Sequence, residues 1–194
     1  MPPMEHAIRD GLCSSKVAQM MPIPSHLADC VVPKELTIDE SPLDAIVRCP
    51  CGSTLFDLLY PGQTHDLGGE PAPCTAEIDG EFFFVIEARC SACQRVHLLL
   101  DSDFHGWNGF VCHDVKQAAI PRPSLVSWTC SSCGETAHEA MIQVQTQGKA
   151  DFVAEAGHKF DADRWPDGFS WFSMAIKCAG CGKRTVDWIS YETM

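Results

Sequence analysis

The chain has 194 residues and a formal net charge of −12, because 26 acidic residues outnumber 14 Lys and Arg. Proteins that bind nucleic acid through its backbone neutralise phosphates with Lys and Arg, so this balance argues against general DNA or RNA binding. Hydrophobic residues make up 45% of the chain and aromatic residues 9%, which excludes a wholly disordered chain and predicts a packed core.

The N-terminal residues 1–40 are predicted to form a partly irregular extension. Prolines interrupt MPIPSHLADCVVP at 21–33, which excludes a long helix there. We find no apolar run of the length that a signal peptide needs, and no stretch approaches the ~18 apolar residues of a membrane span. We therefore expect a cytoplasmic protein with reduced thiols and no membrane association.

Twelve cysteines are present, and eight of them form four close pairs. The pairs are Cys49 and Cys51 in RCPCG, Cys90 and Cys93 in RCSACQ, Cys130 and Cys133 in TCSSCG, and Cys178 and Cys181 in KCAGCGK. So many cysteines indicate either a disulfide framework in an exported protein or metal sites in a reducing compartment. The expected cytoplasmic location favours metal sites. Each pair, together with its short turn, is termed a knuckle.

The knuckles and the segments around them repeat along the chain. Each half reads knuckle, strand, long connection, strand, knuckle, strand, with 81 residues between Cys49 and Cys130. This repetition predicts an internal duplication, with a first subdomain at 41–122 and a second at 123–194. Segments rich in aromatic and β-branched residues are common, and helix signals are few. The fold should therefore be mainly β, with a small α+β content, and built from two antiparallel β subdomains.

The strand-like segments also predict the core. EFFFVIEAR at 81–89 is expected to be one strand, preceded by a hairpin turn at Asp79 and Gly80, and 38–46 is expected to make one turn or a short helix. The side chains predicted to pack inside are Phe82, Phe84, Ile86, Leu98, Leu100, Met141, Ile142, Val144, Phe172, Met174, Ile176 and Trp188.

Two knuckles brought together by strands supply four thiolates in a tetrahedron, each ~2.3 Å from a zinc ion. Gly52, Gly134 and Gly182 follow the second cysteine of three knuckles and suit a positive φ that closes the turn. The pattern resembles the zinc-ribbon superfamily over roughly residues 48–101 and 128–192, although the first knuckle is CxC rather than CxxC. The resemblance implies two structural Zn²⁺ ions per chain, ligated by Cys49, Cys51, Cys90, Cys93, Cys130, Cys133, Cys178 and Cys181.

The loop DSDFHGWNGFVCHD at 101–114 collects reactive residue types between Gly residues. It is a candidate binding loop, presented by His105, Trp107, Asn108, Phe110, Cys112 and His113. The same histidines and thiol, with Asp101, Asp103 or Asp114, are alternatively a third metal site or a Cys–His nucleophile pair. A structural role is the third interpretation, in which Trp107 and Phe110 fold over an open edge. No residue is assigned a catalytic role.

The favoured hypothesis is a non-enzymatic protein with two structural zinc sites, acting on another protein as an adaptor, regulator or inhibitor. Its acidic charge suits a basic protein partner. One alternative is a metal-assisted hydrolase or thiol enzyme that uses the His105–His113 loop. Another is a nucleic-acid-binding ribbon that uses Lys177, Lys183 and Arg184, with Trp188 as a stacking surface. The oligomeric state stays open.

Overall fold

The protein is described from a computed structural model, and the description applies to residues 23–34, 42–67, 69–78, 80–112 and 123–194. The strands are β1 (Val31–Pro33), β2 (Leu43–Val47), β3 (Phe56–Tyr60), β4 (Thr64–Leu67), β5 (Glu70–Pro73), β6 (Ala76–Ile78), β7 (Glu81–Phe83), β8 (Val85–Cys90), β9 (Val96–Asp101), β10 (Val126–Ser127), β11 (Ala137–Gln145), β12 (Trp171–Cys178) and β13 (Arg184–Glu192). The helical segments are η1 (Ser25–Leu27), the π-helix η2 (Trp107–Val111), α1 (Lys149–Ala156), η4 (Gly157–Lys159) and η5 (Ala162–Gly168). The prediction of a mainly β, antiparallel fold is confirmed.

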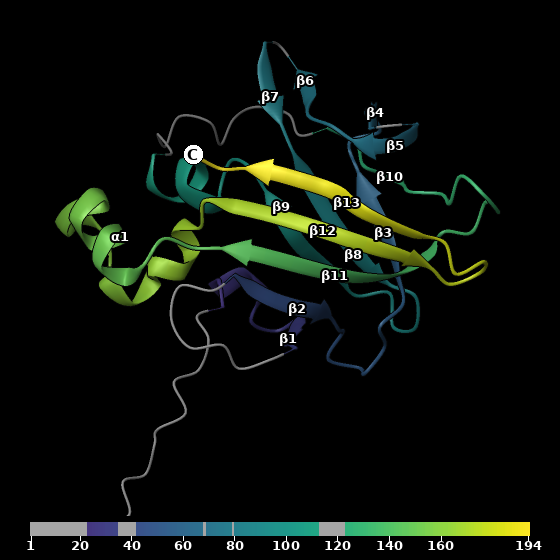
Figure 1. The fold of residues 1–194 in the computed structure, drawn as a ribbon, viewed down its shortest axis with the longest axis horizontal. Helices are drawn as coiled ribbons and strands as arrows, with labels where there is room; N and C mark the ends of the chain where they lie inside the picture. The colour runs from purple at the N-terminus through teal and green to yellow at the C-terminus, as the bar shows by residue number, and fades with distance from the viewer. Residues whose placement is uncertain (1–22, 35–41, 68, 79, 113–122) are drawn as a thin grey trace, which may run out of the picture.

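Nine strands form one sheet that branches at β11. One edge of β11 pairs with β12, which pairs in turn with β13. The other edge of β11 is shared by β3 and β2, and from β3 the sheet continues through β8 to β9. Figure 1 shows β11, β12 and β13 in front, with β8 and β9 running behind them at an angle. The sheet is therefore folded over, and its inner faces enclose the core.

The two halves of the chain exchange their leading strands. In the first half, β2 precedes the first knuckle and pairs with β11 of the second half, where Ala45 lies opposite Ile142. In the second half, β10 precedes the third knuckle and pairs with β3 of the first half. Between these two contacts β3 and β11 pair directly, with Phe56 opposite His138. Each half thus completes the sheet of the other.

The halves also use matching strand registers. Phe56 lies opposite Cys90 in β3 and β8, and His138 lies opposite Cys178 in β11 and β12. The next positions carry equivalent ion pairs, Arg89 with Asp57 and Lys177 with Glu139. The register of each terminal hairpin shifts at the same place, after Ile86 and after Met174. This correspondence is geometric, and an origin by duplication stays a prediction.

A single buried cluster joins the halves. It includes Phe56 and Ile86 from the first half and Phe172 and Trp188 from the second, each 0% exposed. Aromatic contacts cross the boundary, because the ring of Phe84 stacks on that of Tyr191 with 4.9 Å between centroids. The predicted subdomains at 41–122 and 123–194 therefore share one core.

Most of the predicted core is buried, but Phe82 and Met141 were assigned to it wrongly, being 62% and 40% exposed. Phe82 belongs to β7, which pairs with β6 in a separate hairpin rather than with the main sheet. Met141 lies between Ala140 and Ile142, which are 1% and 2% exposed, so its side chain points to the outer face. Leu98 is only half-buried, whereas its neighbour Leu99 is 0% exposed, and the other predicted core residues are buried.

Three local predictions also need correction. The short helix expected at 38–46 is wrong where the structure describes it, since Leu43–Val47 alternates buried and exposed residues as a strand. The segment 81–89 is two strands, because β7 ends at Phe83 and β8 begins at Val85. The helix Lys149–Ala156 was not predicted, because it buries only Phe152 and has a weak apolar stripe.

Removing the Phe56 ring should expose how much the shared core depends on the β3–β11 contact. Phe56→Ala is expected to lower the free energy of unfolding by about 3–5 kcal/mol, since a fully buried aromatic side chain is lost and a cavity remains. Phe82→Ala, at an exposed ring, should change it by less than ~1 kcal/mol. Denaturant titration at constant metal concentration measures both values. Equal losses in the two variants would contradict this placement of the core.

Candidate metal centres

The first cluster of thiols forms where two knuckles of the first half meet. Cys49 and Cys51 lie in the turn between β2 and β3, while Cys90 ends β8 and Cys93 lies in the turn that leads to β9. The Cys49 and Cys93 sulfurs are 3.5 Å apart, and those of Cys51 and Cys90 are 3.6 Å apart. All four sulfurs lie within 4.8 Å of one another.

The second cluster repeats this arrangement in the second half. Cys130 and Cys133 lie between β10 and β11, while Cys178 ends β12 and Cys181 lies in the turn that leads to β13. The Sγ–Sγ distances are 3.7 Å for Cys130 and Cys181 and 3.5 Å for Cys133 and Cys178. The sequence therefore assigned all eight cysteines to the correct two groups.

The backbone of each knuckle explains why the thiols converge. In the first knuckle the N–H of Gly52 donates to the carbonyl of Cys49 at 2.8 Å, and Gly52 has a φ of 95°. Gly134 and Gly182 close their turns in the same way, also with positive φ. The remaining knuckle uses Gln94, whose φ of 61° is uncommon for a residue with a side chain.

The spacing of the sulfurs fits a tetrahedral metal ion and not a disulfide. Four sulfurs at ~2.3 Å from a central ion are ~3.8 Å from one another, close to the distances seen here. A disulfide needs an S–S distance of ~2.05 Å, and the eight knuckle cysteines are all free thiols. The disulfide alternative is therefore wrong for these residues, and each cluster can hold a metal ion.

The electrostatics of the knuckles favour thiolates at selected sulfurs. The backbone N–H of Ser132 is the main reason that the pKa of Cys130 is lowered to about 7. Burial raises the pKa of Cys90, but backbone N–H groups of Cys93 and Ala92 and neighbouring thiols outweigh it, and the net value is about 6. Burial raises the pKa of Cys49 to about 12. A metal ion that binds must therefore displace the protons that the remaining thiols retain.

His97 supports the first cluster, a role that the sequence analysis did not assign. Its Nε2 lies 3.4 Å from Sγ of Cys49, and its ring packs edge-on against Phe56. Burial lowers the pKa of His97, which keeps the imidazole neutral and able to donate one N–H to the sulfur. The signal in the sequence was its place two residues into the strand after a knuckle. Thr185 takes the place of His97 in the second half, since it lies opposite Ile176 of β12 as His97 lies opposite Ala88 of β8. The two clusters therefore have different surroundings.

The basic residues beside the knuckles are largely committed to ion pairs. Lys177 donates to Glu139 at 2.9 Å, and Lys183 donates to Glu70 at 2.7 Å and to the Ser131 hydroxyl at 2.9 Å. Trp188, considered above as a stacking surface, is 0% exposed and cannot receive a base without unfolding of the core. These contacts remove most of the features that suggested a nucleic-acid site.

In the loop at 101–112, the His105 side chain is partly buried against another ring. Its ring stacks on His26 with 3.5 Å between centroids and 13° between planes, and its Nδ1 accepts the N–H of Asp101. His26 in turn donates from Nε2 to the carbonyl of Leu99. Asp167 lies beside the pair and accepts the N–H of Ser25 at 2.6 Å. The pair fastens the N-terminal segment to the end of β9.

The rest of the loop covers an aromatic cluster. The ring of Trp107 packs edge-on against Phe152 of α1, and Phe110 stacks on the same ring. Arg164 lies 4.6 Å above the Phe110 ring. This packing agrees with the structural interpretation of the loop. Asn108 and Cys112 are exposed, His113 lies outside the described residues, and a binding role for the loop stays a prediction.

Within the described ranges, the two cysteine clusters are the groups in which three or more potential metal ligands converge. No helix in the same ranges is long and apolar enough to cross a membrane. Comparisons with protein-family models, curated proteins and solved structures give no match to this chain. The chemistry of the clusters therefore carries the functional argument.

The stacked histidines predict a dependence of stability on pH. Burial lowers the pKa of His26 from 6.5 to about 4 and that of His105 to about 3. Between these values and 6.5 the unfolded chain binds more protons, so the free energy of unfolding falls as the pH falls through this window. This loss is absent above pH 6.5 and, at ~1.36 kcal/mol per pKa unit, reaches at most about 3 kcal/mol for His26 and about 5 kcal/mol for His105.

Denaturant titrations at several pH values measure this effect in wild type and in His105→Phe, which keeps an aromatic ring against His26. The variant should lose stability less steeply on acidification, whereas a change at the exposed His65 (His65→Gln) should leave the slope of the wild type. Acid also protonates the knuckle thiols in all three proteins, so the comparison isolates the histidines. Identical slopes in wild type and His105→Phe would contradict the prediction.

Proposed function

We propose that this chain is a non-enzymatic zinc protein whose two structural zinc sites hold a surface for recognition of another protein. The observation that carries the metal assignment is the pair of four-thiol clusters, each with all sulfurs within 4.8 Å. Four thiolates at tetrahedral spacing are the donor set that Zn²⁺ takes in structural sites. In the reducing compartment expected from the sequence, such thiols remain available to the ion.

A structural role fits the donor set better than a catalytic one. Catalytic zinc keeps one position open for water or substrate, whereas four cysteines fill the coordination of the ion. Each cluster also ties together strands that are far apart in the chain, since 39 residues separate Cys51 from Cys90. Zinc in these sites would stabilise the fold directly, because the ligands are together only in the folded chain.

Recognition of a protein is supported by what remains on the surface. With eight thiolates and two zinc ions, the formal charge would fall from −12 to about −16. A charge of this sign accelerates association with a basic partner and disfavours an acidic one. The committed ion pairs of Lys177 and Lys183 leave little support for a phosphate backbone as the partner.

The enzymatic alternative has less support in the described residues. His105 would have to leave its stack with His26 to act as a base beside Cys112. The pKa of His105, lowered to about 3 by burial, makes it a weak base in its present position.

Metal analysis of single variants tests the proposal. Protein purified without added metal should contain two zinc ions per chain, and Cys51→Ser and Cys133→Ser should each retain one, because each removes a ligand from a different cluster. Cys112→Ser, an exposed cysteine outside both clusters, is the matched control and should retain two. Elemental analysis and native mass spectrometry measure the stoichiometry, and chelation should lower the unfolding temperature of the wild type.

Wild type that is folded, reduced and free of metal would overturn the zinc assignment. Iron in place of zinc would overturn the structural role and direct attention to electron transfer. A third metal ion that is lost in Cys112→Ser would support the enzymatic alternative instead.

A further inference from the structure

The outer edge of β13 offers unpaired backbone groups. Among the described strands, β13 pairs with β12 alone. The N–H of Thr193 donates to the carbonyl of Ser170 at 2.8 Å. This bond shows which residues of β13 direct their backbone groups toward β12 and which direct them away. Neighbouring residues of a strand turn their backbone groups to opposite edges. The N–H and C=O of Ser190 and Glu192 therefore point away from β12.

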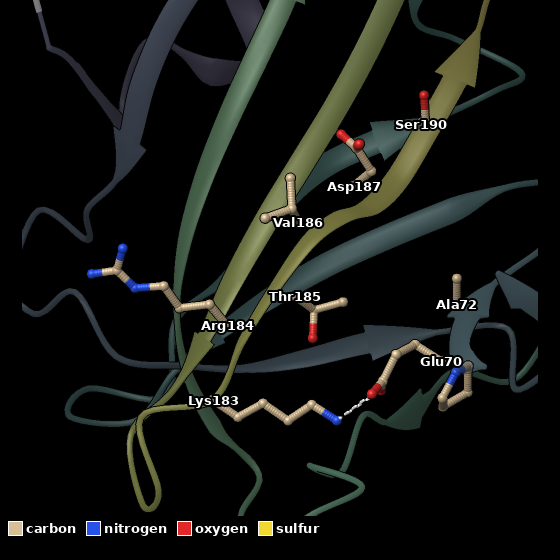
Figure 2. A pocket seen from close by; sticks show the side chains of 9 residues that line it. Glu70, Ala72, Lys183, Arg184, Thr185, Val186, Asp187 and Ser190 are labelled. Carbon is tan, nitrogen blue, oxygen red and sulfur yellow. Dashed lines mark hydrogen bonds and ion pairs between the residues drawn. The ribbon is translucent and has the colours of Figure 1, made fainter. Parts of the chain in front are cut away.

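A groove runs beside this edge. One hollow of about 480 Å³ is lined by β13 and the preceding Lys183 on one side and by the start of β5 on the other. A second of about 290 Å³ continues past Ser190 toward Cys74. Figure 2 shows Thr185 of β13 and Glu70 and Ala72 of β5 on opposite sides of the first hollow, with the Glu70 carboxylate reaching Lys183. We name these two adjoining hollows the β13 groove.

The far wall of the groove is fixed to the second metal centre. Lys183, in the last knuckle, holds both carboxylate oxygens of Glu70 at 2.8 and 2.7 Å and also the hydroxyl of Ser131 in the third knuckle. The β4–β5 hairpin is thereby held at a set distance from β13. Among the described strands β5 does not pair with β13, and the first hollow lies between them.

The outer edge of β9 in the first half is the equivalent of the outer edge of β13. β9 corresponds to β13, and its outer side is covered by η1, a segment of this same chain. There the outward carbonyl of Leu99 accepts a hydrogen bond from His26 at 3.2 Å. A side chain of this chain therefore reaches an outward carbonyl of the first edge, whereas the second edge faces the β13 groove.

We infer that the β13 groove binds an extended, basic segment of a partner protein, which adds to the sheet as a short strand beside β13. This inference rests on the proposed function as a protein-recognition module. Main-chain hydrogen bonds to Ser190 and Glu192 supply the affinity, as in other cases of strand addition. The exposed carboxylates of Asp187 and Glu192 flank Ser190 and select basic side chains on the segment.

The added strand is short because β13 is interrupted. Residues 186–188 lie opposite the single Ala175 of β12, and Asp187 has a positive φ of 53°. Such a bulge bends the outer edge of β13 and prevents regular pairing of an added strand with residues 186–188. Pairing is therefore confined to 189–192, which also protects the free edge from indiscriminate association with other strands.

The test uses the zinc-loaded full chain and a phage-displayed library of random peptides. The tightest selected peptide is synthesised, and its affinity for wild type, Ser190→Pro and Ser190→Ala is measured by fluorescence anisotropy. Proline removes only the outward N–H, which no described backbone group uses, whereas alanine removes only the hydroxyl. We expect Ser190→Pro to bind at least ~10-fold more weakly and Ser190→Ala to bind within ~2-fold of wild type.

Two controls make each outcome decisive. Zinc content must match wild type in both variants, which reports their folding. Hydrogen exchange resolved by NMR then reads the edge in wild type itself: peptide should protect the amide of Ser190 and change that of Tyr191, already turned toward β12, much less. This measurement decides the matter if Ser190→Pro does not fold.

Equal binding by Ser190→Pro and wild type would overturn the groove assignment and leave a protein-recognition function on another surface. Equal losses in both variants would overturn strand addition in favour of contacts to the hydroxyl. Failure to select any peptide would also overturn the inference, while the metal stoichiometry would still report on the proposed zinc sites. Selection of acidic rather than basic peptides would overturn the chemistry assigned to the partner.

Discussion

Convergence of four thiols from two distant turns is the constraint on which the rest of the structure depends. In the first half Cys49 and Cys93 approach to 3.5 Å although 44 residues separate them, and in the second Cys130 and Cys181 approach across 51. Closing loops of this length costs conformational entropy. A hairpin of two strands is too small to repay that cost alone, and metal–thiolate bonds can supply the difference. Once the turns are joined, the registers of the adjoining strands follow.

The halves depend on each other as well as on their own clusters. β2 completes the sheet of the second half and β10 that of the first. The long connections are exchanged too: the β4–β5 hairpin of the first half faces β13, and α1 of the second half packs under Trp107. The resulting core belongs to both halves. The boundary between 122 and 123 thus separates two similar stretches of sequence but does not separate two independent cores.

The sequence revealed what periodicity and cysteine spacing determine. Alternation in EAMIQVQTQ at 139–147 and the four knuckles predicted a strand and the grouping of the thiols, whereas the strand Leu43–Val47 was missed. It could not reveal contacts that depend on how the halves fold together. The stack of His26 on His105 joins residues 79 positions apart and has no local signature. Phe82 misled because aromatic residues favour strands in general, and its exposure depends on a hairpin that leaves the main sheet.

Each cluster has an inner and an outer pair of sulfurs. Cys49 and Cys90 are buried and Cys51 and Cys93 are exposed, and the second cluster follows the same order. A competing thiol or chelator from solution can reach only the outer pair, so ligand exchange has to begin there. The two buried sulfurs remain bonded to the ion until the bonds from the two exposed sulfurs have been replaced. A metal ion would therefore enter and leave each site in steps and from one side. The lifetime of the bound ion would depend on how fast the two exposed thiolates dissociate from it.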